Sequence, residues 1–213
     1  MALIIGVVSQ KGGVGKSTIS RMVAVEYAKH NWNVKIADFD TQQGTSFNWN
    51  GRRLNNRFQP EVSVEMFSKV SQALKLTNVY DLLVFDGLPH SNSTTLEIAK
   101  VSTLVILPTG IALDDLEPTI KLCHELKSSG IDIQKIAVAL VRVGDSETEI
   151  YEAISYINKS GYHLLTGSIP EKVSFRRMSD LGKSITETPF LTLNARAEEL
   201  MASIVDRVDE IKN

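Results

Sequence analysis

The feature that most constrains this chain is a glycine-rich loop between an apolar run and a helical pattern. Residues 11–18 read Lys-Gly-Gly-Val-Gly-Lys-Ser-Thr, and the apolar run 3–8 precedes them. Glycines let the backbone turn tightly and aim successive N–H groups at phosphate oxygens. Lys16 and the positive N-terminal end of the following helix add charge, and the hydroxyl of Ser17 is placed to bind Mg²⁺. The loop therefore predicts a nucleoside-triphosphate site.

The surroundings of the loop agree with this interpretation. A strand at 3–8, a helix at 16–30 and a strand at 34–37 form a βαβ unit of the length that a parallel crossover needs. The alternative, a structural glycine turn without a ligand, does not require this context. The loop residues expected to bind nucleotide are Lys11, Gly12, Gly13, Val14, Gly15, Lys16, Ser17 and Thr18.

Apolar, β-branched runs alternate with helical patterns along the rest of the chain. Strands are predicted at 3–8, 34–37, 62–67, 82–85, 103–107, 136–141 and 163–169. Helices are predicted at 16–30, 92–100, 113–129, 147–160 and 193–212. This alternation predicts an α/β fold of the P-loop type, with a mostly parallel twisted sheet covered by helices on both faces. Because no linker or repeat interrupts the pattern, residues 1–213 are expected to form a single domain.

Composition limits the function classes. The chain has 23 Lys+Arg and 25 Asp+Glu, a net charge of −2, so binding to nucleic acid would need a local basic patch. The single cysteine, Cys123, excludes a disulfide framework and reads as a small core residue of a protein in a reducing cytosol. We expect no membrane span, because no apolar window is long enough, and a cytoplasmic location.

Aspartates follow two of the predicted strands. Asp86 comes after the strand at 82–85 and is predicted to hold Mg²⁺ through water. Asp40, two residues after Asp38, is predicted to orient the attacking water and is a second candidate metal ligand, also through water. Taken alone, either aspartate more often caps a turn. His90 is expected to be neither a base nor a ligand, and no His/Cys cluster suits zinc or an iron–sulfur centre.

The loop departs from the usual phosphate-binding pattern, and the departure identifies a family. Gln10 stands where the first glycine is normally found, and Lys11 adds a second lysine beside the glycines. In this deviant loop the chain resembles the ParA/MinD family of ATPases, most closely the short plasmid-type ParA proteins without an N-terminal helix-turn-helix. Further segments extend the resemblance, namely 44–49, 52–53, 140–144, 168–177 and 182–187. Where the family has D-x-D-P-Q, Thr41 replaces the proline, which removes a backbone restraint and is not expected to abolish turnover.

The resemblance implies a mechanism. ATP and Mg²⁺ would be the cofactors of a weak, partner-stimulated ATPase in which Lys11, Lys16 and Asp40 act in catalysis. Lys11 would reach across a nucleotide-sandwich homodimer to phosphates bound by the other subunit, so that dimerisation depends on ATP. Further nucleotide contacts are implied for Arg142, Pro170 and Glu171.

Two basic clusters are candidates for DNA binding. The first contains Arg52, Arg53 and Arg57, and the resemblance favours the second, which contains Arg176, Arg177 and Lys183. Such clusters give phosphate contacts that bind duplex DNA without sequence preference. The alternative for both clusters is a solvated helix face without a partner. A further alternative for Arg52 and Arg53 is that they form part of the dimer interface.

The leading interpretation is a ParA-type DNA partition or positioning ATPase that is stimulated by a ParB-like centromere-binding or adaptor protein and is associated with the nucleoid. One alternative is a MinD-like membrane-positioning ATPase, which the acidic character of 195–212 disfavours. The other is an ATP-dependent metabolic ligase of the dethiobiotin-synthetase type, for which no set of substrate-binding residues is evident.

Overall fold

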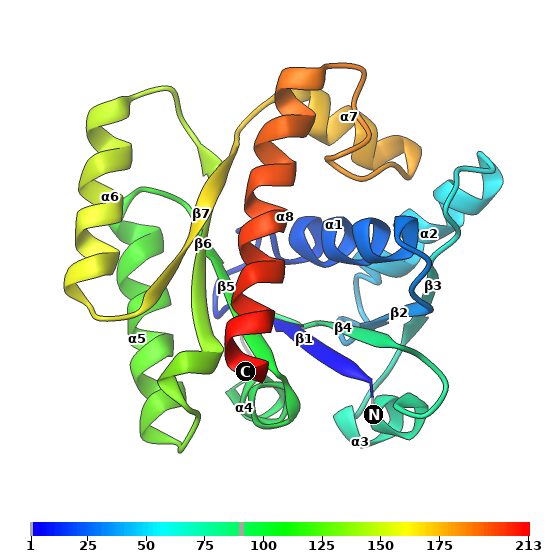
Figure 1. Ribbon diagram of the computed structural model, residues 1–213, viewed down its shortest axis with the longest axis horizontal. Helices are drawn as coiled ribbons and strands as arrows, with labels where there is room; N and C mark the ends of the chain where they lie inside the picture. Colours follow the sequence, from blue (N-terminus) through cyan, green and yellow to red (C-terminus); the bar gives the residue numbers. More distant parts are fainter. Residues whose placement is uncertain (1, 90–91) are drawn as a thin grey trace.

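The structure is a computed structural model that describes residues 2–89 and 92–213, so His90 lies outside the described residues. Within this part of the chain, seven strands form one sheet: β1 (Leu3–Val7), β2 (Val34–Asp38), β3 (Ser63–Met66), β4 (Leu82–Asp86), β5 (Leu104–Thr109), β6 (Ile136–Val143) and β7 (His163–Pro170). All neighbours pair in parallel, in the order β3-β2-β4-β1-β5-β6-β7 (Figure 1). The predicted parallel sheet is confirmed.

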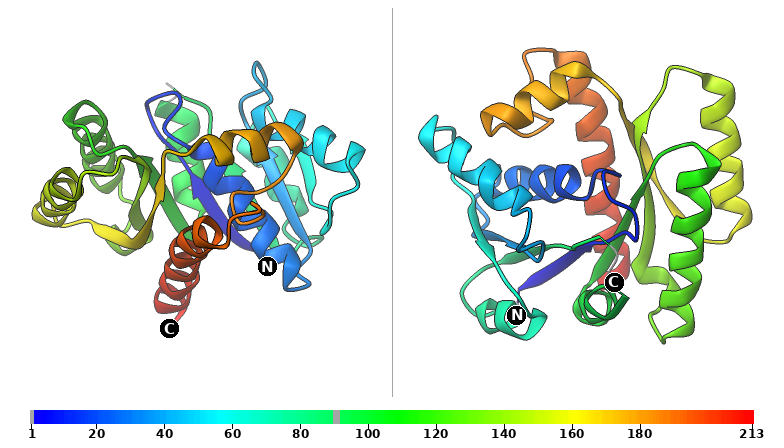
Figure 2. Two further views of the ribbon diagram at one scale, coloured as in Figure 1. Left: turned by 90° about the horizontal axis from the view of Figure 1, so that it is seen from above. Right: turned by 180° about the vertical axis from the view of Figure 1, so that it is seen from behind.

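Helices cover both faces of this sheet (Figures 1 and 2). One face packs against α1 (Lys16–Lys29), α2 (Thr45–Asn55), α7 (Val173–Leu181) and α8 (Leu191–Lys212). The other face packs against α3 (Val70–Ala73), α4 (Asn92–Val101), α5 (Leu113–Ser128) and α6 (Glu147–Lys159). Short 3₁₀ turns occur at Leu74–Leu76 and Ile133–Lys135. No helix among the described residues is long and apolar enough to span a bilayer.

The central strands read as continuous apolar runs because both of their sides are buried. Every residue of β1 and β4 is buried, as expected for parallel strands between two helical layers. Cys123 lies buried on α5, and burial raises the pKa of its thiol to about 12. Its predicted role as a core residue is confirmed.

Three helices lie outside the predicted set. α3 and α7 are short. α2 begins with the residues Thr-Ser-Phe-Asn-Trp-Asn-Gly, which have low helix propensity. α2 forms because the carboxylate of Asp38 accepts hydrogen bonds from Ser46 N at 2.9 Å and Phe47 N at 3.1 Å. These bonds satisfy N–H groups of its first turn from another element, which local propensity cannot reveal.

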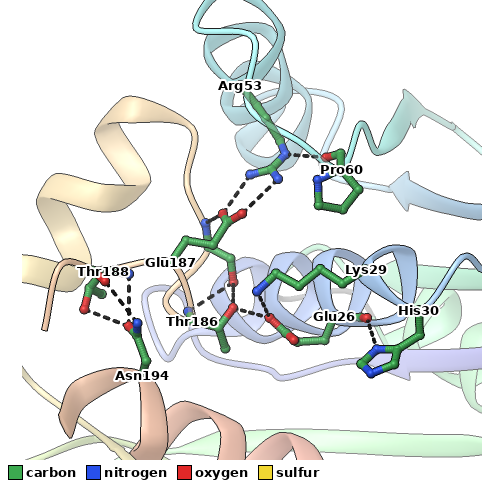
Figure 3. A network of polar contacts seen from close by, with 10 residues as sticks. Glu26, Lys29, His30, Arg53, Pro60, Thr186, Glu187, Thr188 and Asn194 are labelled. Atoms are coloured by element: carbon green, nitrogen blue, oxygen red, sulfur yellow. Dashed lines mark hydrogen bonds and ion pairs between the residues drawn. The ribbon is translucent and has the colours of Figure 1, made fainter. Parts of the chain in front are cut away.

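One of the predicted basic residues lies inside the protein. Arg53, on α2, is fully buried and binds Glu187 through two bonds of 2.8 and 3.0 Å (Figure 3). Its Nε donates to the carbonyl of Pro60, its Nη1 donates also to the carbonyl of Gly182, and its guanidinium lies over the ring of Trp49. Arg53 is therefore unavailable to DNA or to a dimer face, and that part of the first-cluster hypothesis is wrong. The pair instead joins α2 to the loop that follows α7.

We predict that Arg53→Met destabilises the protein by about 3 kcal/mol, because it leaves the Glu187 carboxylate without its buried partner. Urea unfolding measures the loss. Arg177→Met, which removes an exposed arginine, should change stability by less than about 0.5 kcal/mol. Equal stabilities for the two variants would contradict the structural role of this pair.

Candidate functional site

The glycine-rich loop runs from the end of β1 to the first residue of α1, Lys16. Gly13 has a φ of 76° and Gly15 a φ of 97°, backbone conformations that side chains rarely tolerate. A Cβ on Gly15 would also lie 3.1 Å from Cγ2 of Val141. Glycine is therefore required at Gly15 both by its backbone angle and by the close approach of β6.

The loop forms one wall of a cleft of about 570 Å³ at the carboxyl ends of the strands, where parallel sheets bind ligands. Most of the residues that the sequence predicted for the site line this cleft, namely Gly12, Gly13, Gly15, Lys16, Ser17, Thr18, Asp40, Asp86, Arg142, Pro170, Glu171, Arg176 and Lys183. Val14, within the loop, is buried and does not line the cleft. The topology thus brings together residues as far apart in the sequence as Gly12 and Lys183.

Lys16 is buried at the base of the cleft, and its Nζ donates to the carbonyl of Lys11 at 3.1 Å. Burial lowers the pKa of Lys16, while the charges of Asp86 and Asp40 act in the opposite direction. A buried ammonium has lost part of its hydration, and an anion such as a phosphate can replace the lost water with charge-assisted hydrogen bonds.

Two carboxylates lie side by side at the ends of β2 and β4, because Asp38 and Asp86 are register partners. Burial, together with the neighbouring charge of Asp86, raises the pKa of Asp38 to about 6. Burial also raises the pKa of Asp86, and Ser46, Arg21, Ser17 and Lys16 oppose this shift. Placing two buried carboxylates together is unfavourable unless cations face them.

Asp40 lies in the loop between β2 and α2, where it lines the cleft and is partly exposed. Its Oδ1 accepts from Gln43 N at 3.0 Å, and its carbonyl accepts from Gly44 N at 2.7 Å. This turn is closed by hydrogen bonds although Thr41 replaces the family proline. The carboxylate keeps one oxygen for a water in the cleft.

The donor set beside Lys16 fits Mg²⁺. It consists of the Ser17 hydroxyl and the carboxylates of Asp86 and Asp40, the oxygen ligands that this ion prefers. Oδ1 of Asp86 is buried and has no hydrogen-bond partner of normal geometry among the described residues. Within the same residues, no group of three or more His, Cys, Asp or Glu side chains could hold a metal alone. Mg²⁺ sites in nucleotide-binding proteins typically add phosphate oxygens and waters to one or two protein ligands.

Lys11, which the resemblance implies would reach across a dimer, has a partner within its own subunit. Its Nζ forms an ion pair with Asp115 and donates to the carbonyl of Asp114 at 3.3 Å. Both aspartates are in the first turn of α5. The Lys11 side chain is half-exposed and contacts α5, and Lys11 is not among the residues that line the cleft. Reaching a second subunit would require Lys11 to leave Asp115.

Arg142 lies where β6 and β7 lose register, between the pairs of Val141 and Val143. Its φ of 57° is unusual for a non-glycine residue, and the irregularity redirects its side chain. The guanidinium donates to the carbonyl of Gly13 at 3.1 Å and to Glu171 at 3.1 Å. Arg176 also binds Glu171, at 3.3 Å. Glu171 therefore links the loop side of the cleft to α7.

Sequence reasoning missed Arg21 and Ser46, which lie directly beneath the carboxylates. Arg21 is buried on α1, and burial lowers its pKa to about 10. It donates to Ser46 Oγ at 3.3 Å, to the Thr45 carbonyl at 2.6 Å and to Ser179 Oγ at 2.8 Å. An arginine within an apolar helix was the available signal, since buried arginines normally have partners.

A family model described as the CobQ/CobB/MinD/ParA nucleotide binding domain matches residues 5–185. The chain belongs to this family. It is an ATP-binding protein and an ATPase, as the resemblance implied. Among curated proteins, none matches it significantly.

Solved structures of this fold include MinD proteins and a protein described as a partition protein. The cell division ATPase MinD of Pyrococcus furiosus is 22% identical, with a TM-score of 0.75, and 97% of this chain and 99% of that one are covered. MinD of Pyrococcus horikoshii OT3, complexed with Mg-ADP, is 21% identical with a TM-score of 0.76 over 100% and 99%. A protein described as a plasmid partition protein of Borrelia burgdorferi B31, bound to AMPPNP, is 18% identical with a TM-score of 0.72 over 97% and 100%. These likenesses establish the P-loop α/β fold.

The site predicts different defects for its lysine and its loop aspartate. Lys16→Ala should weaken ATP binding by about 100-fold, because it removes a buried charge from the phosphates. Asp40→Ala should bind ATP within about threefold of the unmodified protein but hydrolyse it about 100-fold more slowly. Nucleotide titration and single-turnover hydrolysis separate the two. Asp206→Ala, on the exposed side of α8, is the control, and normal hydrolysis by Asp40→Ala would overturn its assignment.

Proposed function

We propose that this ATPase is a ParA-type DNA partition or positioning protein that dimerises with ATP and then binds duplex DNA without sequence preference. The observation that carries the proposal is the position of α7. Arg176 lines the nucleotide cleft with an exposed guanidinium, and Arg177 next to it on the same helix is exposed. Binding or hydrolysis of the nucleotide could therefore change the position of these two arginines through one short helix.

The chain's own residues suit hydrolysis at this site. The loop N–H groups and Lys16 would hold the phosphates, and Asp40 would hold the attacking water in line. Mg²⁺ at Ser17 and Asp86 would supply charge neutralisation for the phosphates. The likeness to MinD with Mg-ADP supports this cofactor pair.

Dimerisation would complete the site. Within its own subunit the Lys11 ammonium is held by an exposed ion pair with Asp115 and a 3.3 Å bond to the Asp114 carbonyl. An exposed ion pair contributes about 1 kcal/mol or less. A triphosphate on a second subunit offers a much stronger charge. We propose that Lys11 leaves Asp115 and binds that triphosphate, which makes the homodimer depend on ATP.

The DNA surface would be formed by α7 rather than by α2. Arg53 is buried, and Arg52 donates to the Ser179 carbonyl at 3.4 Å, so α2 offers few free charges. Lys183 is half-buried, with its ammonium 4.8 Å from the centroid of Phe58, and is less available than the two arginines. A dimer would double this modest patch, which suits a chain of net charge −2 that binds DNA only with ATP.

The other parts of the proposal rest on resemblance. A ParB-like centromere-binding or adaptor protein would stimulate hydrolysis, and DNA binding would hold the protein at the nucleoid. A MinD-like membrane role is less well supported, because apolar residues along α8, among them Leu200 and Ile204, pack into the core, although Leu191 at its start is exposed. Such a packed face is not free to enter a membrane surface.

The dimer proposal predicts that a nonhydrolysable ATP analogue, and not ADP, converts the protein from monomer to dimer. Lys11→Ala should remain monomeric with the analogue while still binding it. Light scattering measures the mass, and Lys121→Ala, which removes an exposed lysine of α5, is the control. Dimer formation by Lys11→Ala equal to that of the control would refute the role of this lysine.

The DNA proposal predicts that replacing Arg176 and Arg177 together by alanine weakens binding to unrelated duplexes about equally, by about tenfold or more. ATP-driven dimerisation should persist, and the slope of affinity against salt should become shallower. Fluorescence anisotropy with two DNA sequences measures both effects. The matched control replaces Lys121 and Lys127, two exposed lysines of α5. If both double variants bind DNA alike, α7 is not the DNA surface.

A further inference from the structure

Ser46 lies at the junction of three elements of the site. It is fully buried near the beginning of α2, between the ends of β2 and β4 and the buried side of α1. Its backbone N–H donates to Oδ2 of Asp38 at 2.9 Å, and its hydroxyl donates to Oδ2 of Asp86 at 2.6 Å. One residue therefore binds both carboxylates, which are register partners on adjacent strands.

Chemistry fixes the direction of the hydroxyl bond. Arg21 Nε lies 3.3 Å from Ser46 Oγ and can only donate, so the serine oxygen accepts there. The single hydroxyl proton of Ser46 is then directed to Asp86, whose carboxylate can only accept. Arg21 has two further bonds, to Thr45 and Ser179, that hold its guanidinium in place.

The bond to Ser46 also determines what remains available on Asp86. Oδ2 is occupied, whereas Oδ1 is buried and has no hydrogen-bond partner of normal geometry among the described residues, although hydrogen bonding from the nearby Ser17 hydroxyl also stabilises the charged carboxylate. Buried carboxylate oxygens normally have partners, so this oxygen is suited to a ligand that arrives with the nucleotide. Rotation of the carboxyl group would break the 2.6 Å bond, and the hydroxyl therefore holds Oδ1 in one direction.

We propose that Ser46 is a positioning residue that aims Asp86 at the Mg²⁺ ion of the nucleotide, with Arg21 fixing the direction of its hydroxyl. The inference rests on the proposed placement of Mg²⁺ beside Ser17 and Asp86. Ser46→Ala removes the bonds of the hydroxyl to Asp86 and to Arg21 Nε, while the backbone bond to Asp38 and the two other bonds of Arg21 remain. Residues that orient metal-binding groups in this way typically change metal affinity by about 10-fold to 100-fold.

The test is the affinity of the ADP-loaded protein for Mn²⁺, followed by electron paramagnetic resonance. Ser46→Ala should weaken Mn²⁺ binding by about 10-fold and leave ADP affinity in the presence of EDTA unchanged. The matched control is Ser102→Ala, which removes another buried hydroxyl, one that donates to the Ile98 carbonyl within α4. This control should bind Mn²⁺ like the unmodified protein.

Asp86→Asn separates this inference from the metal placement on which it rests. Weaker Mn²⁺ binding by both Asp86→Asn and Ser46→Ala supports the proposal. Weaker binding by Asp86→Asn with unchanged binding by Ser46→Ala overturns the role of Ser46 alone, and unchanged binding by both overturns the metal placement as well. If Ser46→Ala does not fold, Ser46→Cys keeps a side chain there with a much weaker donor, and unchanged Mn²⁺ affinity in that variant refutes the proposal.

Discussion

The repulsion between two buried carboxylates governs the arrangement of this protein's functional edge. Asp38 and Asp86 face each other across neighbouring parallel strands, and burial disfavours the charged form of both. The structure compensates with the first N–H groups of α2, the hydroxyl of Ser46 and the charges of Arg21 and Lys16. These compensating groups belong to α1 and α2, so the same interactions that stabilise the carboxylates fix both helices against the sheet. The edge is thereby ready for a cation that arrives with phosphate.

A second consequence is the attachment of α7 to the same network. Arg21, which supports Ser46, also binds Ser179 on α7 at 2.8 Å. The residue after this helix, Gly182, has a φ of 86°, and a Cβ there would lie 2.2 Å from Arg53 N. Only glycine permits so close an approach between α2 and the end of α7. The helix that carries Arg176 and Arg177 is therefore packed against the helices that form the nucleotide cleft, without a flexible linker.

Much of the fold followed from local sequence. The strands and the longer helices repeat their apolar pattern over enough residues to be recognised. The phosphate-binding residues of the loop at 11–18 are contiguous in the sequence, so that site can be predicted from the sequence alone. The remainder depends on partners distant in sequence. α2 needs the carboxylate of Asp38, Arg53 is neutralised by Glu187, and Lys11 meets Asp115 more than a hundred residues away. From the sequence alone, a basic residue is expected to be exposed to solvent. Only the fold distinguishes the buried Arg53 from the exposed Arg177.

The most direct test of the central claim is a crystal structure of the protein with Mg²⁺ and a nonhydrolysable ATP analogue. The β- and γ-phosphates should accept hydrogen bonds from the N–H groups of 13–18 and from Lys16 Nζ. Mg²⁺ should bind the Ser17 hydroxyl and, through water, Oδ1 of Asp86. Phosphates bound elsewhere in the cleft, or Mg²⁺ distant from both Ser17 and Asp86, would contradict the account.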